Sequence, residues 1–302
     1  MDFLKITDIT PSQLGEILSL SAKLKKEYKS GVINHSLEHK TLAMIFAKPS
    51  TRTRVSFEAA MTQLGGHAIY LDTSTSQVSR GETWQDTGLA VGSMADAIMA
   101  RVHSHSILTE LAAGSPVPVI SGLSAIEHPC QILADLLTIS ECSKNLAGGK
   151  LAYVGDCANN VANSLMVGCA MAGMDVSLVG PASKKPGADY LEAARSFSTH
   201  AEFTTDAKAG LADADVVYTD TWLSMGDAAD EKSTLSLFAP YQVNAKLMAY
   251  AKKDAIFMHC LPAHRGQEVS AEVIDGKQSV VGLEASNRLH AQKGLLVWLL
   301  GA

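Results

Sequence analysis

The sequence predicts an α/β fold of two domains, each a mainly parallel sheet flanked by helices. The chain has 302 residues, enough for two domains of ordinary size that each bury a core. Short apolar segments typical of buried strands alternate with helical patterns along the whole chain. The alternation restarts after the stretch Asn145-Leu-Ala-Gly148-Gly149. We therefore expect a first domain over residues 1–145 and a second over 146–283, built from right-handed strand–helix–strand units.

The expected elements of the first domain follow from periodicity and end signals. Thr10, Pro11 and Gln13 resemble a capped helix start, and Phe57, Ala60, Met61 and Leu64 mark one face of a helix that stops at Gly65-Gly66. Strands are expected over 41–47, 67–71, 97–101 and 117–121. Helices are expected over 10–30, from 50 to 64, over 84–94 and from 132 onward.

The same reasoning places the elements of the second domain. Strands are expected over 151–154, 176–179, 201–204, 216–218 and 255–258. Helices are expected over 161–171, 188–197, near 207–211 and over 284–300.

Composition excludes several classes of protein. Hydrophobic residues make up 47% and charged residues 19%, which is typical of a globular chain. The net charge of −6 gives no electrostatic footprint for nucleic acid. Five cysteines without CxxC spacing indicate free thiols in a reducing compartment. With neither a secretory signal nor an apolar run of membrane-spanning length, we expect a cytoplasmic protein with no membrane partner.

An anion site is predicted where the 41–47 strand meets the next helix. The stretch Ser50-Thr51-Arg52-Thr53-Arg54 places hydroxyls, outward-facing backbone N–H groups and two guanidinium groups at one helix N-terminus. The helix dipole adds partial positive charge there, and arginine offers a bidentate fork for phosphate oxygens. An ordinary serine cap followed by surface arginines is the alternative.

Other polar groups of the first domain follow later strands. Arg101 ends one strand, and His128 and Gln131 flank the start of another helix, with Pro129 preset for its first turn. The polar segment 72–82 is either a mobile surface loop or a lid that carries Gln77 to a ligand.

In the second domain, a strand leads into the turn Gly155–Asn160 without the GxGxxG pattern, so no dinucleotide is indicated. Asn159 and Asn160 either cap the next helix or bind a small zwitterion. Further polar loops begin at Asp220 and at His259, and Arg288 lies near the start of the last helix.

Four motifs in this order resemble those of the carbamoyltransferases. They are Ser-Thr-Arg-Thr-Arg, His-Pro-x-Gln, Asp-x-x-x-Ser-Met-Gly and His-Cys-Leu-Pro-Ala-His-Arg-Gly, and the last two resemble the ornithine branch. The resemblance spans residues 41 to 293. It implies transfer of a carbamoyl group from carbamoyl phosphate to L-ornithine, giving citrulline and phosphate, with neither a metal nor an organic cofactor. It also implies a homotrimer or higher homo-oligomer, and a role in arginine metabolism.

The resemblance implies roles for matching positions, in a cleft between the domains, with the helix 284–302 completing the first domain. The catalytic groups would be Arg101, His128 and Cys260. The same three would also bind carbamoyl phosphate, together with Ser50, Thr51, Arg52, Thr53, Gln77, Gln131, Leu261 and Arg288. The ornithine groups would be Asn160, Asp220, Ser224 and Met225. Arg54 would be structural.

Several alternatives remain at this point. Aspartate as acceptor would need cationic side chains where Asp220 stands, whereas Asp220 suits an α-ammonium group. Putrescine would leave Asp220, Ser224 and Met225 without an α-amino and carboxyl group to bind. An N-modified ornithine changes only the pocket shape, and a non-catalytic ligand-binding protein on the same fold is a different class of answer. Cys260 is either the proton acceptor or an orienting thiol.

Overall fold

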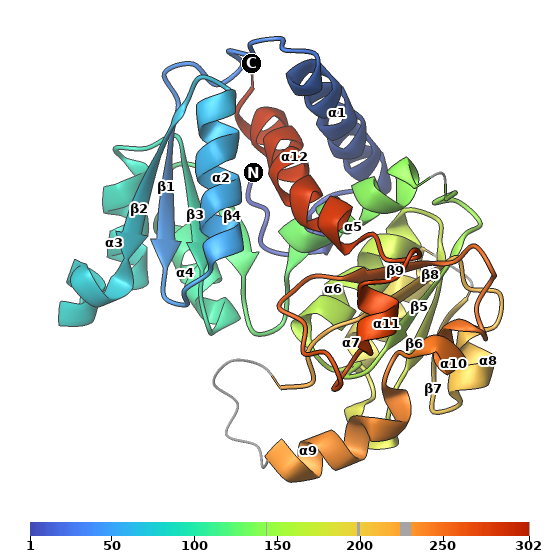
Figure 1. Ribbon diagram of the computed structural model, residues 1–302. Helices are drawn as coiled ribbons and strands as arrows, with labels where there is room; N and C mark the ends of the chain where they lie inside the picture. The colour runs from blue at the N-terminus through green and yellow to red at the C-terminus, as the bar shows by residue number, and fades with distance from the viewer. Residues whose placement is uncertain (143, 198–199, 224–230, 302) are drawn as a thin grey trace. The chain divides into compact units, whose positions relative to one another are not determined.

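A computed structural model describes residues 1–142, 144–197, 200–223 and 231–301 (Figure 1). The described chain divides into two compact units. Unit 1 comprises Met1–Leu137 and Ser286–Ala302, and unit 2 comprises Thr138–Ala285. The chain passes from one unit to the other within helix α5 (Pro129–Glu141) and again within helix α12 (Val281–Leu300). Within the described ranges, no helix combines the length and the apolar character needed to cross a membrane.

Unit 1 contains a parallel sheet of four strands in the order β2-β1-β3-β4. Its strands are β1 (Thr41–Phe46), β2 (His67–Asp72), β3 (Ala97–Arg101) and β4 (Val119–Leu123). Its other α-helices are α1 (Pro11–Lys29), α2 (Thr51–Gln63), α3 (Trp84–Gly92) and α4 (His105–Gly114). Short 3-10 turns are η1 (Ile6–Asp8), η2 (Thr73–Thr75) and η3 (Gln77–Arg80). The strand order reverses between β1 and β3, so the carboxyl ends of these two strands are the expected ligand site.

Unit 2 contains a parallel sheet of five strands in the order β7-β6-β5-β8-β9. Its strands are β5 (Lys150–Val154), β6 (Asp175–Val179), β7 (Ala201–Thr204), β8 (Val216–Thr219) and β9 (Ile256–His259). Its helices are α6 (Asn160–Met171), α7 (Ala188–Arg195), α8 (Ala207–Leu211), α9 (Glu231–Phe238), α10 (Ala245–Met248) and α11 (Ala271–Ile274), with 3-10 turns η4 (Ala182–Lys184) and η5 (Ala239–Tyr241). The order reverses between β5 and β8, which predicts a second ligand site at their carboxyl ends.

The predicted α/β fold with two parallel sheets is confirmed, and most expected elements are present. The expected start of α1 is also confirmed, because Thr10 and Gln13 form a reciprocal capping box. The strand predicted over 117–121 is shifted to Val119–Leu123, since Pro118 has no N–H to donate to a ladder. The segment 72–82, predicted as a loop, contains two 3-10 turns. The sequence analysis did not anticipate α4, α9, α10 or α11.

In unit 1, α12 lies against α1, and the two helices run side by side in Figure 1. Lys25 Nζ donates to Asn287 Oδ1 at 2.6 Å, and Trp298 Nε1 donates to Glu16 Oε2 at 3.1 Å. Between these contacts, Gly294 of α12 has no room for a side chain. A Cβ there would overlap Ser21 Oγ and approach the carbonyl oxygen of Ile17 to 2.8 Å.

We expect Gly294→Ala to lower the free energy of unfolding by about 1–3 kcal/mol, because the backbone of α1 cannot move aside in a packed core. Gly15→Ala is the matched control, since Gly15 lies on the exposed side of α1 and an added methyl group there would have nothing within 4 Å of it. That change should raise stability by about 0.5–1 kcal/mol through helix propensity. Urea unfolding of both variants measures the two effects, and equal stabilisation by both would contradict the packing of α12 described here.

Candidate active site

The N-terminus of α2 has the local structure that an anion site requires. Ser50 is the N-cap, and its Oγ accepts from the backbone N–H of Thr53 at 3.3 Å and donates to Thr53 Oγ1 at 3.1 Å. Thr51 and Arg52 follow in the first turn, Thr51 exposed and Arg52 partly buried. Hydroxyl groups, helix N–H groups and one guanidinium group therefore gather at the carboxyl end of β1.

Arg54 makes contacts that differ from those expected of a ligand-binding group. Its Nε donates to Glu58 Oε1 at 2.8 Å, one turn along α2, and its guanidinium carbon lies 3.9 Å from the centre of the Tyr70 ring. These contacts hold the side chain along the helix surface. They suit the structural role that the resemblance implies for Arg54.

Arg101 stands at the point where the strand order of unit 1 reverses. It is the last residue of β3, and its side chain is buried. Its backbone carbonyl accepts from the N–H groups of Ala47 and Lys48, at 2.9 and 3.3 Å. The turn that leads from β1 to Ser50 is thus fixed against the end of β3.

His128 is a neutral imidazole among positive charges. It directly precedes α5 and is 5% exposed. Burial lowers the pKa of His128 well below its usual value, and nearby cationic side chains lower it further. These side chains are those of Arg288, Arg101, Arg52 and Lys48. A neutral imidazole in such surroundings can donate one hydrogen bond to an oxygen that gains negative charge.

Arg288 joins this group from α12. Its Nη1 donates to Gln131 Oε1 at 2.7 Å, and its Nη2 donates to Thr53 Oγ1 at 3.4 Å. All three side chains are buried. The last helix therefore links the start of α2 to the first turn of α5 within unit 1.

Gln77 is the predicted residue of unit 1 for which the described contacts give least support. It begins η3 and is exposed to solvent. It lies beside an apolar hollow of about 280 Å³ that Ile45, Ile69 and Leu71 also line. Its assignment to carbamoyl phosphate stays a prediction.

In unit 2, Asp220 follows β8 and is buried. Its Oδ1 accepts from the N–H of Thr221 at 2.8 Å and from Cys260 Sγ at 3.1 Å, and its Oδ2 lies 3.4 Å from the donor Nδ2 of Asn159. Burial raises the pKa of this carboxyl, although the charge of His259 and the hydrogen bonds from Cys260 and Thr221 oppose the shift. A buried carboxylate of this kind is stabilised by a bound cation.

Cys260 and Leu261 are held in place by the residues around them. Leu261 has a φ of 60°, a left-handed conformation that costs a branched side chain free energy. Its N–H donates to His259 Nδ1 at 2.9 Å. The other ring nitrogen of His259 lies 3.2 Å from Glu268 Oε1. Burial would raise the pKa of Glu268, but hydrogen bonds from His259 and from the backbone of His264 lower it.

The two asparagines that follow β5 have different places. Asn159 is the N-cap of α6, and its Oδ1 accepts from the N–H of Ala162 at 2.7 Å while its Nδ2 donates to Tyr153 Oη at 2.9 Å. It is also the asparagine that reaches Asp220. Asn160, the predicted ornithine ligand, is the partly exposed first residue of α6. Ser224 and Met225 lie outside the described residues.

One group of side chains has the donors of a metal site. Single ligand atoms of Asp220, His259 and Cys260 lie within 4.8 Å of one another. Both ring nitrogens of His259 already have partners, Leu261 N–H and Glu268. A metal ion here would have to displace one of these partners, so the group suits proton and ammonium chemistry better than metal binding.

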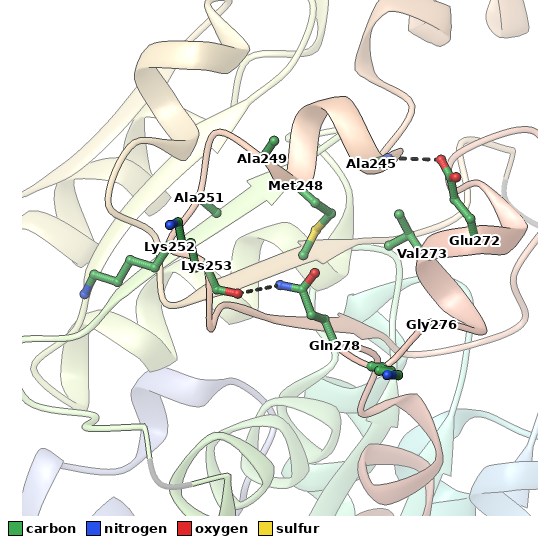
Figure 2. A pocket seen from close by; sticks show the side chains of 11 residues that line it. Ala245, Met248, Ala249, Ala251, Lys252, Lys253, Glu272, Val273, Gly276 and Gln278 are labelled. Carbon is green, nitrogen blue, oxygen red and sulfur yellow. Dashed lines mark hydrogen bonds between the residues drawn. The ribbon is translucent and has the colours of Figure 1, made fainter.

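A larger hollow lies elsewhere in unit 2 (Figure 2). It measures about 470 Å³ and is lined by side chains from α10, α11 and the chain around Lys252 and Gln278. Glu272 accepts from the N–H of Ala245 at 3.2 Å, and Gln278 Nε2 donates to the carbonyl oxygen of Lys253 at 3.4 Å. These polar groups hold the walls of the hollow together. None of its lining residues is among the predicted site residues.

The sequence analysis missed several residues that contact or surround the predicted ones. They are Lys48, Asp135, Asn159 as a partner of Asp220, and the pair His259 and Glu268. Lys48 gave a signal, because a cation stood at a strand end two residues before Ser50. Asp135 also gave a signal, because it stands four residues after Gln131 on the same helix. The contact of Asn159 with Asp220 gave none that spacing could reveal, since the two residues come from different elements.

Both units of the chain resemble domains of a known protein family. Residues 1–141 match the carbamoyl-P binding domain of aspartate/ornithine carbamoyltransferase, and residues 147–299 match the Asp/Orn binding domain of the same family. The two matches cover nearly the whole chain. They confirm the resemblance drawn from the four motifs.

Individual relatives agree. The ornithine carbamoyltransferase of Carboxydothermus hydrogenoformans is 50% identical, with 99% of this chain and 97% of that protein covered. That of Methanosarcina mazei is 48% identical, with 99% of both covered. The solved ornithine carbamoyltransferase from Pyrococcus furiosus superposes with a TM-score of 0.95 at 46% identity, covering 99% of this chain and 96% of that one. The chain therefore belongs to the aspartate/ornithine carbamoyltransferase family.

Proposed function

We propose that this protein transfers the carbamoyl group of carbamoyl phosphate to the side-chain amine of L-ornithine, giving L-citrulline and inorganic phosphate. The observation that carries the proposal is the neutral, buried His128 among the positive charges of arginines from α2, β3 and α12. The relatives named ornithine carbamoyltransferase support the same reaction.

The charges of unit 1 match the donor substrate. Carbamoyl phosphate carries about two negative charges, and Arg52, Arg101 and Arg288 supply three guanidinium groups. The surplus favours a transition state in which charge grows on the departing phosphate. Ser50, Thr51 and Thr53 would add hydroxyl and backbone donors from the start of α2.

The reacting bonds suit these groups. The neutral ornithine nitrogen attacks the carbonyl carbon, and a new C–N bond forms. The bond from that carbon to the bridging phosphate oxygen breaks, and the nitrogen releases one proton, which the departing phosphate takes up. As the C–O bond breaks, phosphate leaves with the electron pair. His128 would donate a hydrogen bond to the carbonyl oxygen, which becomes more negative as the nitrogen approaches.

The attacking amine must be neutral, and positioning offsets that cost. An alkyl ammonium has a pKa near 10.4, so its deprotonation at pH 7 costs roughly 4.6 kcal/mol, from about 3.4 units at about 1.36 kcal/mol each. Holding two substrates in reactive geometry contributes about 7–11 kcal/mol. The reaction therefore needs no strong base, and we assign Cys260 the role of orienting the amine while Asp220 holds the thiol.

Asp220 supports ornithine as the acceptor. Its buried carboxylate would pair with the α-ammonium group, whereas a second substrate with two carboxylates, such as aspartate, would be repelled. We propose that Asn160, Ser224 and Met225 contact the same end of ornithine. Gln131 would accept from the carbamoyl NH₂ group.

We also propose that the protein works as a homotrimer or a larger assembly of trimers, in the cytoplasm and in arginine biosynthesis. The five cysteines, which form no disulfide in the described part of the chain, support a reducing compartment. The proposed oligomeric state is inferred from membership of the family alone. Neither a metal ion nor an organic cofactor has a place in the proposed reaction.

A citrulline assay tests the proposed function directly. Purified protein with carbamoyl phosphate should form citrulline from ornithine, at a kcat/KM at least about a hundredfold above the carbamoylation of aspartate, putrescine or N-acetylornithine. Faster carbamoylation of another acceptor would reassign the substrate. No product from any acceptor, in a protein that still binds carbamoyl phosphate, would favour a non-catalytic binding role.

A further inference from the structure

Asp135 is a buried acidic residue of α5, and the polar residues Gln131 and Thr138 on the same face of the helix are buried with it. It is 0% exposed, as are its neighbours Ile132, Leu133 and Leu136. A buried carboxyl group lowers stability unless hydrogen bonds compensate it. Gln131 Nε2, one turn earlier on the same helix, donates to Asp135 Oδ1 at 2.8 Å. Asp135 thus contacts a residue that we place at the carbamoyl group.

Two partners fix which end of the Gln131 amide faces which way. Arg288 is a donor only, so the atom that meets its Nη1 at 2.7 Å must be the amide oxygen. The amide nitrogen then faces Asp135, which accepts from it. The two ends of an amide group have nearly the same shape, so shape alone does not assign the nitrogen and the oxygen. Here the donor Arg288 and the acceptor Asp135 assign them.

The two partners differ in what happens when substrate binds. In the proposed reaction the guanidinium group of Arg288 would also donate to the phosphate, which would leave fewer of its N–H groups for Gln131. Asp135 lies on the same helix as Gln131, so its hydrogen bond to Gln131 Nε2 would be kept when the substrate binds. It would therefore keep the amide oxygen toward the substrate during the reaction.

We propose that Asp135 is a positioning residue that makes the site specific for a carbamoyl group. With its oxygen held forward, Gln131 accepts from the NH₂ group of carbamoyl phosphate. Acetyl phosphate has the same charge and nearly the same shape but a methyl group in that place, so it gains nothing from this oxygen. The inference rests on the proposed function, because it takes carbamoyl phosphate as the ligand of unit 1.

The test compares three ligands of the intact protein by calorimetry: carbamoyl phosphate, acetyl phosphate and inorganic phosphate. Wild type should bind carbamoyl phosphate at least about tenfold more tightly than acetyl phosphate. Asp135→Leu and Asp135→Ala remove the acceptor and should lower this ratio to about twofold, with phosphate affinity within about twofold of wild type. Asp135→Asn retains an acceptor oxygen and should restore most of the ratio.

Each outcome decides the inference. An unchanged ratio in the leucine and alanine variants, or an equal loss for all three ligands, would mean that Asp135 only packs α5. Equal binding of carbamoyl and acetyl phosphate by wild type would overturn the inference even if neither variant folds. The same measurements distinguish a failure of the proposed function from a failure of this inference. If wild type binds carbamoyl phosphate more tightly than acetyl phosphate but makes no citrulline, the proposed function is wrong and the role of Asp135 stands.

Discussion

Arg52→Ala is expected to lower kcat/KM for carbamoyl phosphate by an amount equivalent to about 2–5 kcal/mol of transition-state stabilisation. Arg52 lies in the first turn of α2, and its charge acts on the buried His128. The change removes a positive charge and a bidentate donor from a site built for an anion. Steady-state kinetics at saturating ornithine measures the loss.

Arg54→Ala is the matched control, two residues along the same helix. Arg54 is 48% exposed and pairs with Glu58 on the surface of α2. Its loss should leave kcat/KM within about twofold of wild type and cost about 0.5–1 kcal/mol of stability. A near-normal Arg52 variant, or an Arg54 variant that is equally damaged, would show that the anion site at Ser50 is wrongly assigned.

The sequence predicted where the candidate site residues lie relative to the strands better than it predicted the contacts between them. Ser50, Arg101 and His128 each follow or end a strand that local pattern could identify, and parallel strands bring their carboxyl ends to one edge of a sheet. The order of the strands was not readable in this way. Which strands are neighbours depends on contacts between segments far apart in the sequence.

Short helices were missed for a physical reason. α10 and α11 have four residues each, little more than one turn, so no 3.6-residue period can develop within them. They form because the surrounding core covers their apolar side chains, among them Leu247 and Val273. Tertiary packing, rather than local propensity, decides such segments.

The orientation of side chains could not be predicted from the sequence either. Asn159 was open to two interpretations, as a helix cap and as a ligand-binding amide. Its Oδ1 caps α6 while its Nδ2 reaches Tyr153 and Asp220. Gln131 meets Arg288 from a position 157 residues away in the chain. No spacing rule links such pairs, because they depend on the completed fold.

Asp220→Asn is expected to lower kcat/KM for ornithine by an amount equivalent to about 2–5 kcal/mol while changing carbamoyl phosphate affinity by less than about twofold. Asparagine has nearly the same shape and keeps one acceptor oxygen for Thr221 N–H and Cys260. It lacks the charge that would pair with the α-ammonium group. Asp254→Asn is the charge-matched control in unit 2, because that side chain is 78% exposed and pairs with Lys144.

The pH dependence separates charge from shape at this position. Burial raises the pKa of Asp220, so in the free enzyme the carboxylate gains a proton at a higher pH than an ordinary aspartate does. Above that pKa wild type is charged and the asparagine variant is not, and the difference in kcat/KM for ornithine should be full. As pH falls through the raised pKa, both side chains become neutral and the two profiles should converge. The need for a neutral attacking amine makes both profiles rise with pH and cancels in their ratio. A ratio that stays constant across the whole range, or an equal loss of affinity for both substrates, would make Asp220 a structural residue and remove it from the ornithine site.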